Sequence, residues 1–262
     1  MRTLRLFVLA AVAGTFLLFR AAPIPAQTPH EPTGLERRFA RHFPEKPPVL
    51  FEFAESAEHR PLIIITNLHQ YPLTAYVVQT EPKSANDTPQ TLTYDALTRM
   101  GGLLAPIPRS LSHKIGVPHI VGAPVPDPKL VAAVWEDGST FGPDDLLARI
   151  SNIRKAQADS YDLAIATLKT GLEKNWSVEE YVTAAQKLRP ALPSQPASME
   201  EARASSEKLT AAIMPSLTIR DNMQHAVQDN PSPADVAKLA QTLLKSFEES
   251  RDALRKALGG AP

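Results

Sequence analysis

The amino-acid sequence predicts an α+β protein, with a β-sheet region over residues 49–142 and a helical hairpin or small bundle over residues 143–262. Two observations support this prediction. Before Pro143, several short segments carry apolar residues at every second position, as strands do when their two faces meet different surroundings. After Pro143, apolar residues recur every three to four positions, which is the period of an amphipathic helix.

The first 26 residues have the pattern of a secretory signal peptide. Two arginines precede an apolar stretch of 14 residues, Leu6 to Phe19, which ends at Arg20. A membrane-spanning helix needs about 20 apolar residues, and small residues at positions 21, 22 and 26 offer cleavage points. We therefore expect export to the periplasm or the extracellular space, with no transmembrane span in the mature chain. An uncleaved N-terminal membrane anchor is the alternative.

The composition excludes several classes of site. The chain contains no cysteine, so thiol catalysis, disulfide bonds and metal binding by thiolates are excluded. Without its first 26 residues the chain carries 25 basic and 28 acidic residues. That balance does not provide the positive surface that binds nucleic-acid phosphates. We therefore expect no nucleic-acid partner, and the sequence indicates no cofactor.

Residues 27–48 are rich in proline and charge, which is typical of an extended spacer. Within them, "LERRFARHF" has enough apolar residues for one or two amphipathic turns that could dock on the rest of the protein. The first strand signals follow directly. "VLFEFAES" alternates apolar and polar residues, and "PLIIITN" is a short β-rich run bounded by proline and asparagine.

The segment "NLHQYP" predicts the corner at which one strand leaves a sheet and the next strand enters. Asn67 tolerates turn geometry, and Pro72 restricts the residue before it to extended backbone. The next strand signal is "PLTAYVVQT". Strict alternation there places two sets of residues on opposite faces, Leu73, Ala75 and Val77 against Thr74, Tyr76 and Val78.

The segment "KLVAAVWEDGSTFG" predicts a β-hairpin closed by Asp137 and Gly138. Asp-Gly favours a tight reversal in which both turn residues have positive φ. The intervening residues 101–128 are heavy in proline and glycine, so we expect long loops with one or two edge strands there.

The helical region begins at Pro143, whose missing N–H suits a first turn. Ser177 with Glu180, and Ser198 with Glu201, have the spacing of capping boxes that open the next two helices. Pro215 is expected to kink or end the second of these. A last helix runs from "SPADVAKL" to a stop at Gly259-Gly260. The apolar seam of this helix contains Val236, Ala240, Leu243, Phe247, Leu254 and Leu258.

Two of these segments, "IIITNLHQYPLTAYVVQ" and "VAAVWEDGSTFG", resemble the strand–turn–strand units of immunoglobulin-like domains in exported bacterial proteins. Joined to helices as they are here, they resemble uncharacterised bacterial extracytoplasmic proteins. The resemblance covers residues 49–142. It implies an N-terminal immunoglobulin-like antiparallel β-sandwich followed by the helices, and it implies no catalytic residue and no defined function.

Motifs for common chemistries are missing from the sequence, which has no Gly-x-Ser-x-Gly elbow, no glycine-rich phosphate loop and no His-Glu-x-x-His. Among the seven histidines, His113 and His119 form the closest pair in the body of the chain and could share a metal with a carboxylate. Glu136 and Asp137 could ligate calcium, although a turn explains them as well. We assign no catalytic, cofactor-binding or metal-ligating residue.

These observations favour a non-enzymatic structural or protein-interaction module that meets a protein or another component of the bacterial envelope. Two alternatives stay open. One is an enzyme with a site at the junction of sandwich and helices, for which His113, His119, Glu136 and Asp137 are the candidates. The other is a carbohydrate- or surface-binding module that uses exposed aromatic residues, drawn from Tyr71, Tyr76, Trp135, Phe141, Tyr161 and Trp176.

Overall fold

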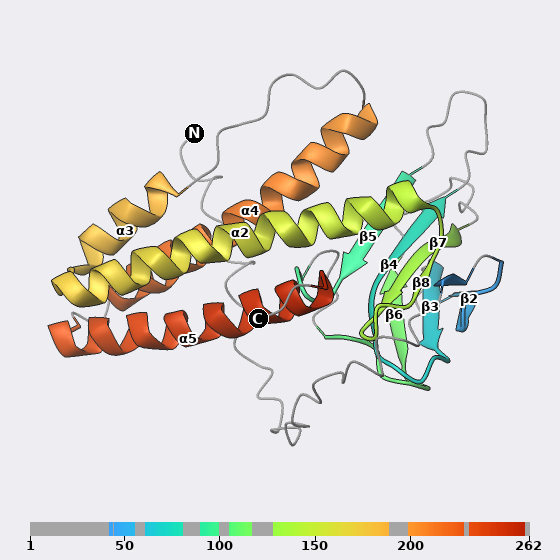
Figure 1. Ribbon diagram of the computed structural model, residues 1–262, viewed down its shortest axis with the longest axis horizontal. Helices are drawn as coiled ribbons and strands as arrows, with labels where there is room; N and C mark the ends of the chain where they lie inside the picture. Colours follow the sequence, from blue (N-terminus) through green and yellow to red (C-terminus); the bar gives the residue numbers. More distant parts are fainter. Residues whose placement is uncertain are drawn as a thin grey trace, which may run out of the picture.

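The computed structural model describes residues 42–43, 45–55, 61–80, 90–99, 105–116, 128–188, 199–227 and 231–259. The expected signal peptide, most of the expected spacer, His119 and Ser198 lie outside these residues. The described part is α+β, with two β-sheets followed by helices at the C-terminal end (Figure 1). The predicted class and the predicted order of the two parts are therefore confirmed.

One sheet has five strands in the order β1-β8-β7-β4-β5, and the other has three in the order β2-β3-β6. Neighbouring strands are antiparallel except for β1 and β8, which are parallel. Strand β1 comes from the end of the expected spacer, so these residues join the sheet. The strands are β1 (His42–Phe43), β2 (Val49–Glu55), β3 (Pro61–Asn67), β4 (Leu73–Thr80), β5 (Gln90–Asp95), β6 (Ser112–Gly116), β7 (Pro128–Trp135) and β8 (Thr140–Phe141).

The two sheets pack face to face around a shared apolar core. The alternation in β3 turns Ile63 and Ile65 inward, where they are 1% and 0% exposed, and leaves Ile64 on the opposite face. The chain crosses from one sheet to the other after β1, after β3, after β5 and again after β6. The core contains Val49, Ile63, Ile65 and Ile115 from the smaller sheet and Leu73, Tyr76, Val78, Tyr94, Ala133 and Trp135 from the larger one.

Helix α2 (Asp144–Lys174) covers the other face of the five-stranded sheet and makes a third layer (Figure 1). Ile150 of α2 packs on Ala75, Val77 and Ala132, and the small alanines allow the helix to approach closely. A sheet buried on both faces has no solvent side. This explains why every residue from Leu73 to Val78 is buried, although their sequence alternates.

The predicted facing of β4 is wrong at its first two residues, Leu73 and Thr74. The register of β4 against β7 shifts between Leu73 and Ala75, as it does at a β-bulge. Leu73 therefore joins Tyr76 in the core between the sheets, and Thr74 points toward α2, where it contacts Arg154. Strict alternation fails here because a bulge inserts one residue and reverses the facing of those before it.

The helices form a small bundle that extends away from the sheets (Figure 1). Helices α4 and α5 pack along α2, and α3 packs on α4. Their bounds are α3 (Val178–Lys187), α4 (Met199–Val227) and α5 (Pro233–Ala257). The bundle core contains Ala164, Ile165, Leu168, Val178, Tyr181, Ala185, Ile219, Met223, Val236, Ala240, Leu243 and Phe247. Within the described residues, none of these helices is long and apolar enough to cross a membrane.

Local signals fix most helix ends. The predicted capping box of Ser177 and Glu180 opens α3, and a second box opens α5, where the hydroxyl of Ser232 accepts from the backbone N–H of Asp235. The expectation that Pro215 could end its helix is wrong, because α4 continues through this residue. Proline removes one helical hydrogen bond. Next to it, the hydroxyl of Ser160 on α2 donates to the Ala212 carbonyl of α4, which ties this turn to the neighbouring helix.

Candidate functional site

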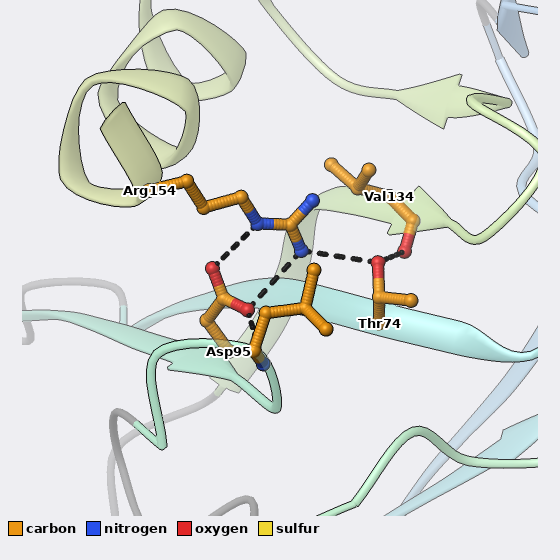
Figure 2. A network of polar contacts seen from close by, with 5 residues as sticks. Thr74, Asp95, Val134 and Arg154 are labelled. Atoms are coloured by element: carbon orange, nitrogen blue, oxygen red, sulfur yellow. Dashed lines mark hydrogen bonds and ion pairs between the residues drawn. The ribbon is translucent and has the colours of Figure 1, made fainter. Parts of the chain in front are cut away.

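A buried polar network joins α2 to the five-stranded sheet (Figure 2). Arg154 Nε donates to Asp95 Oδ2 at 2.8 Å, and its Nη2 donates to Asp95 Oδ1 at 3.1 Å and to the hydroxyl of Thr74 at 3.0 Å. That hydroxyl in turn donates to the Val134 carbonyl at 3.0 Å. Arg154 and Asp95 are only 2% and 1% exposed. The network therefore crosses three strands, β5, β4 and β7, from a single helical residue.

Three local features bring these groups together. Arg154 lies one helical turn after Ile150, so it emerges on the same face of α2, toward the sheet. Asp95 ends β5 and also accepts from the backbone N–H of Leu97 at 2.9 Å. The bulge in β4 turns Thr74 toward the helix. A charged pair removed from water is tolerated only when each partner is well hydrogen-bonded, and here both are. The network fixes the orientation of α2 on the sheet.

Asn67, at the end of β3, is a second polar centre and is fully buried. Its Nδ2 donates to the carbonyls of Tyr71 and Ile107, both at 2.8 Å. Its Oδ1 accepts from the backbone N–H of His69 and from Trp135 Nε1, both at 3.0 Å. All donors and acceptors of this amide are used. The predicted corner is confirmed, but Asn67 is not among the residues with positive φ; its side chain holds the corner together instead.

The aromatic residues at this corner pack on one another. Trp135 lies 5.6 Å from Phe43 and 5.2 Å from His69 between ring centroids, and His69 lies 5.7 Å from Tyr71. Trp135 and Tyr76 are 1% and 0% exposed. A carbohydrate platform needs exposed, coplanar rings. These two of the six aromatic candidates are instead part of the core between the sheets.

His113 lies on β6 and meets two tyrosines of the opposite sheet. The hydroxyl of Tyr76 is hydrogen-bonded to its Nδ1, and the rings of Tyr76 and Tyr94 stack with centroids 4.8 Å apart. Burial lowers the pKa of His113 and raises the pKa of both tyrosines, most strongly that of Tyr76. Each shift favours the neutral form. The three rings therefore form an uncharged contact between the sheets.

The structure does not bring Glu136 or Asp137 to His113. Asp137 is 7% exposed and lies in the turn between β7 and β8, where its carboxylate accepts from the backbone N–H and the hydroxyl of Ser139 at 3.0 and 2.8 Å. Glu136 is exposed. No group of three histidine and acidic residues in the described ranges could hold a metal ion. His119 lies outside these ranges.

The turn that holds Asp137 differs from the predicted one. Only Gly138 has positive φ, at 86°, and Asp137 does not. Trp135 N–H donates to the Ser139 carbonyl and Gly138 N–H donates to the Trp135 carbonyl, which is the pattern of a three-residue loop with a glycine bulge. The side chain of Asp137 then faces Ser139, and its role is to close the hairpin.

Within the described residues, one face of the three-stranded sheet carries exposed apolar side chains. We call it the outer face, meaning the side of the three-stranded sheet that points away from the core. Leu50 on it is 46% exposed, and Leu68 just beyond β3 is 51% exposed. Glu52 and Lys114 are its exposed charges. Alternation from the inward Ile63, Ile65 and Ile115 assigns to this face Leu50, Glu52 and Ala54, Leu62, Ile64 and Thr66, and Ser112, Lys114 and Gly116.

Comparisons of this chain with protein-family models, with curated proteins and with solved structures found no match.

Proposed function

We propose that this protein is an exported, non-enzymatic interaction module of the bacterial envelope, and that the outer face is its binding surface. The observation that carries the proposal is the exposure of Leu50 and Leu68, at 46% and 51%, beside the half-buried Ile64. Each sheet has one face in the shared core, and α2 covers the remaining face of the larger sheet. Exposed apolar side chains bordered by charge are typical of protein–protein contacts.

The way this surface is mounted supports the proposal. Arg154 on α2, bonded to Asp95 and Thr74, holds the helix on the sandwich in one orientation. The bundle then extends from the sandwich on the side opposite the three-stranded sheet (Figure 1). The outer face and the far end of α2 therefore occupy distant parts of one molecule. Such a shape suits a protein that presents a binding surface at a distance from its helices.

We further propose that the sandwich is immunoglobulin-like. Strand order supports this assignment, since β2-β3-β6 lie in one sheet and β8-β7-β4-β5 in the other. The crossings after β3, after β5 and after β6 match the Greek-key connectivity that immunoglobulin-like sandwiches share. Export is supported by the signal-peptide pattern of the first 26 residues. Cell fractionation with N-terminal sequencing of the mature chain tests it, and an intact Met1 on a cytoplasmic protein would contradict it.

Site-specific photo-crosslinking in intact cells tests the binding surface. A photoreactive residue at Leu50 is expected to yield a discrete crosslinked species. Leu163 provides the matched control, because it is a leucine of similar exposure, 56% against 46%, on the outer side of α2. Equal crosslinking from positions 50 and 163, or none from position 50, would refute the outer face as the binding surface.

A further inference from the structure

We propose that the outer face binds a second copy of this chain, face to face, about a two-fold axis parallel to β3. This inference rests on the proposed function and names the partner of the same surface. It follows from where the two charges of the face lie, from the apolar column between them and from the symmetry that these positions allow.

The charges lie in one row across the sheet. Glu52 of β2 is opposite Ile64 of β3, and Ile64 is opposite Lys114 of β6. Neighbouring strands are about 4.8 Å apart, so the two charges flank Ile64 at a separation of about 10 Å. Both side chains are exposed, and in the described part of the chain neither forms an ion pair. The face thus has a negative edge, an apolar centre and a positive edge.

Two-fold symmetry makes this arrangement complementary to itself. A rotation of 180° about an axis parallel to β3, midway between two facing sheets, exchanges the β2 side with the β6 side. Glu52 of each copy then lies opposite Lys114 of the other, and Ile64 lies opposite Ile64. A two-fold axis across the strands would instead place Glu52 opposite Glu52. Because like charges across an interface are costly, the charges select the first orientation.

The rest of the face fits the same orientation. Leu62 and Ile64 of β3 lie on the axis, and the contact would complete the burial of their half-buried side chains against their symmetry mates. Leu50 would lie opposite Ser112, whose hydroxyl is bonded to the hydroxyl of Thr66 at 2.7 Å and so keeps a partner when water leaves. The contact therefore leaves no hydroxyl group without a partner in the row of Leu50, Thr66 and Ser112. In the row of Ala54, Leu62 and Gly116, the glycine leaves open space, since nothing lies within 4 Å of a Cβ placed there.

The size of the face sets the strength of the contact. Three strands of about five residues cover about 15 by 17 Å, which is well below the roughly 800 Å² that each partner buries in an interface of standard size. The dimer is therefore weak and depends on concentration. Charge substitutions at exposed positions will change such a contact without unfolding the protein.

Charge reversal measured by analytical ultracentrifugation tests the proposal. The purified mature chain is expected to dimerise reversibly, and Glu52→Lys or Lys114→Glu alone is expected to weaken this dimer about tenfold. An equimolar mixture of the two single variants restores both attractive contacts and is expected to form a heterodimer. The double variant is expected to dimerise like the wild type. Unchanged circular dichroism spectra confirm that each variant is folded.

Each other outcome overturns the inference. A wild-type chain that stays monomeric over the whole concentration range, or single variants that dimerise as it does, excludes this two-fold contact. Crosslinking from position 50 separates this failure from failure of the proposed function. If the crosslinked species contains a different envelope protein, the outer face is a binding surface but a second copy is not its partner. If the chain is monomeric and position 50 yields no crosslink, both proposals are refuted.

Discussion

Removing the guanidinium of Arg154 is expected to be the most costly single change at the junction of sheet and helix. Arg154→Ala takes away two hydrogen bonds to Asp95 and one to Thr74. It leaves a carboxylate that is 1% exposed without a cation. Breaking a buried ion pair on one side costs about 3–5 kcal/mol, because the remaining charge stays buried and uncompensated. Asp95→Ala is expected to cost a similar amount, because it leaves the buried guanidinium of Arg154 without a negative partner.

The double variant separates pairing from simple loss of contacts. When both charges are absent, no uncompensated charge remains, so Arg154→Ala with Asp95→Ala is expected to cost less than the sum of the single changes. The coupling energy should approach about 3 kcal/mol, the upper range for residues in direct contact. Equilibrium unfolding in urea, followed by far-ultraviolet circular dichroism, measures the free energy of unfolding of the four proteins in this double-mutant cycle, which are the wild type, the two single variants and the double variant.

An exposed ion pair provides the control for this cycle. Lys169 of α2 and Glu248 of α5 lie 2.9 Å apart, but their side chains are 54% and 37% exposed. A pair in water contributes about 0–1 kcal/mol, so Lys169→Ala should change the free energy of unfolding little. Single changes at Arg154 or Asp95 that cost less than 1 kcal/mol, or free energies that simply add, would refute the role assigned to the network.

Three further changes test other contacts. Asn67→Ala leaves the buried Trp135 Nε1 without its acceptor and removes the side-chain donor to the Tyr71 and Ile107 carbonyls, and is expected to cost about 1–3 kcal/mol, measurable by urea unfolding together with a shift in Trp135 fluorescence. Gly171→Ala would place a Cβ 2.2 Å from the buried ring of Tyr181 and is expected to cost about 1–3 kcal/mol, seen as a lower Tm. Burial lowers the pKa of His113 below its ordinary value of 6.5. As the pH falls below 6.5, the unfolded chain therefore binds a proton at His113 before the folded chain does, and the free energy of unfolding decreases. His113→Asn should make the free energy of unfolding in urea differ less between pH 7.5 and pH 5.5.

Each of these three predictions has a control variant or a result that would contradict it. Gln70 is exposed in the same corner, so Gln70→Ala should leave stability unchanged, and a loss equal to that of Asn67→Ala would show that any change at the corner is harmful. Gly116 has nothing within 4 Å of an added Cβ, so Gly116→Ala controls for the loss of glycine itself. If His113→Asn leaves the pH dependence as it was, the acid sensitivity arises elsewhere.

Local patterns were sufficient for most of the elements. The alternation in "VLFEFAES" and the β-rich run "PLIIITN" correspond to β2 and β3, and the helical period after Pro143 corresponds to α2. The serine and glutamate of the first predicted capping box make the expected reciprocal bonds at the start of α3. These features depend on neighbours within four residues along the chain, so their signals are contained in short stretches of sequence.

Contacts between distant segments were not predictable in the same way. Arg154 reads as one more charge on a helix, and only its meeting with Asp95, 59 residues earlier, makes it a buried partner of the sheet. Asn67 reads as a turn residue, yet its amide receives the indole N–H of Trp135, 68 residues later. The sequence left a surface role for Trp135 and Tyr76 open as an alternative to packing. Burial of these side chains depends on which elements pack together, and periodicity does not specify that.

Four features follow from the amino-acid sequence alone, namely the α+β class, the order of sheet and helices, the corner after β3 and the start of α3, because each is set by short-range backbone and side-chain preferences. Three others emerge only in the folded protein: β4 is buried on both faces, the bundle extends from the sheets, and Glu52 and Lys114 lie in one row on the outer face. These features arise when segments far apart in the chain become neighbours, and the free energy that selects them comes from burial and pairing between those segments.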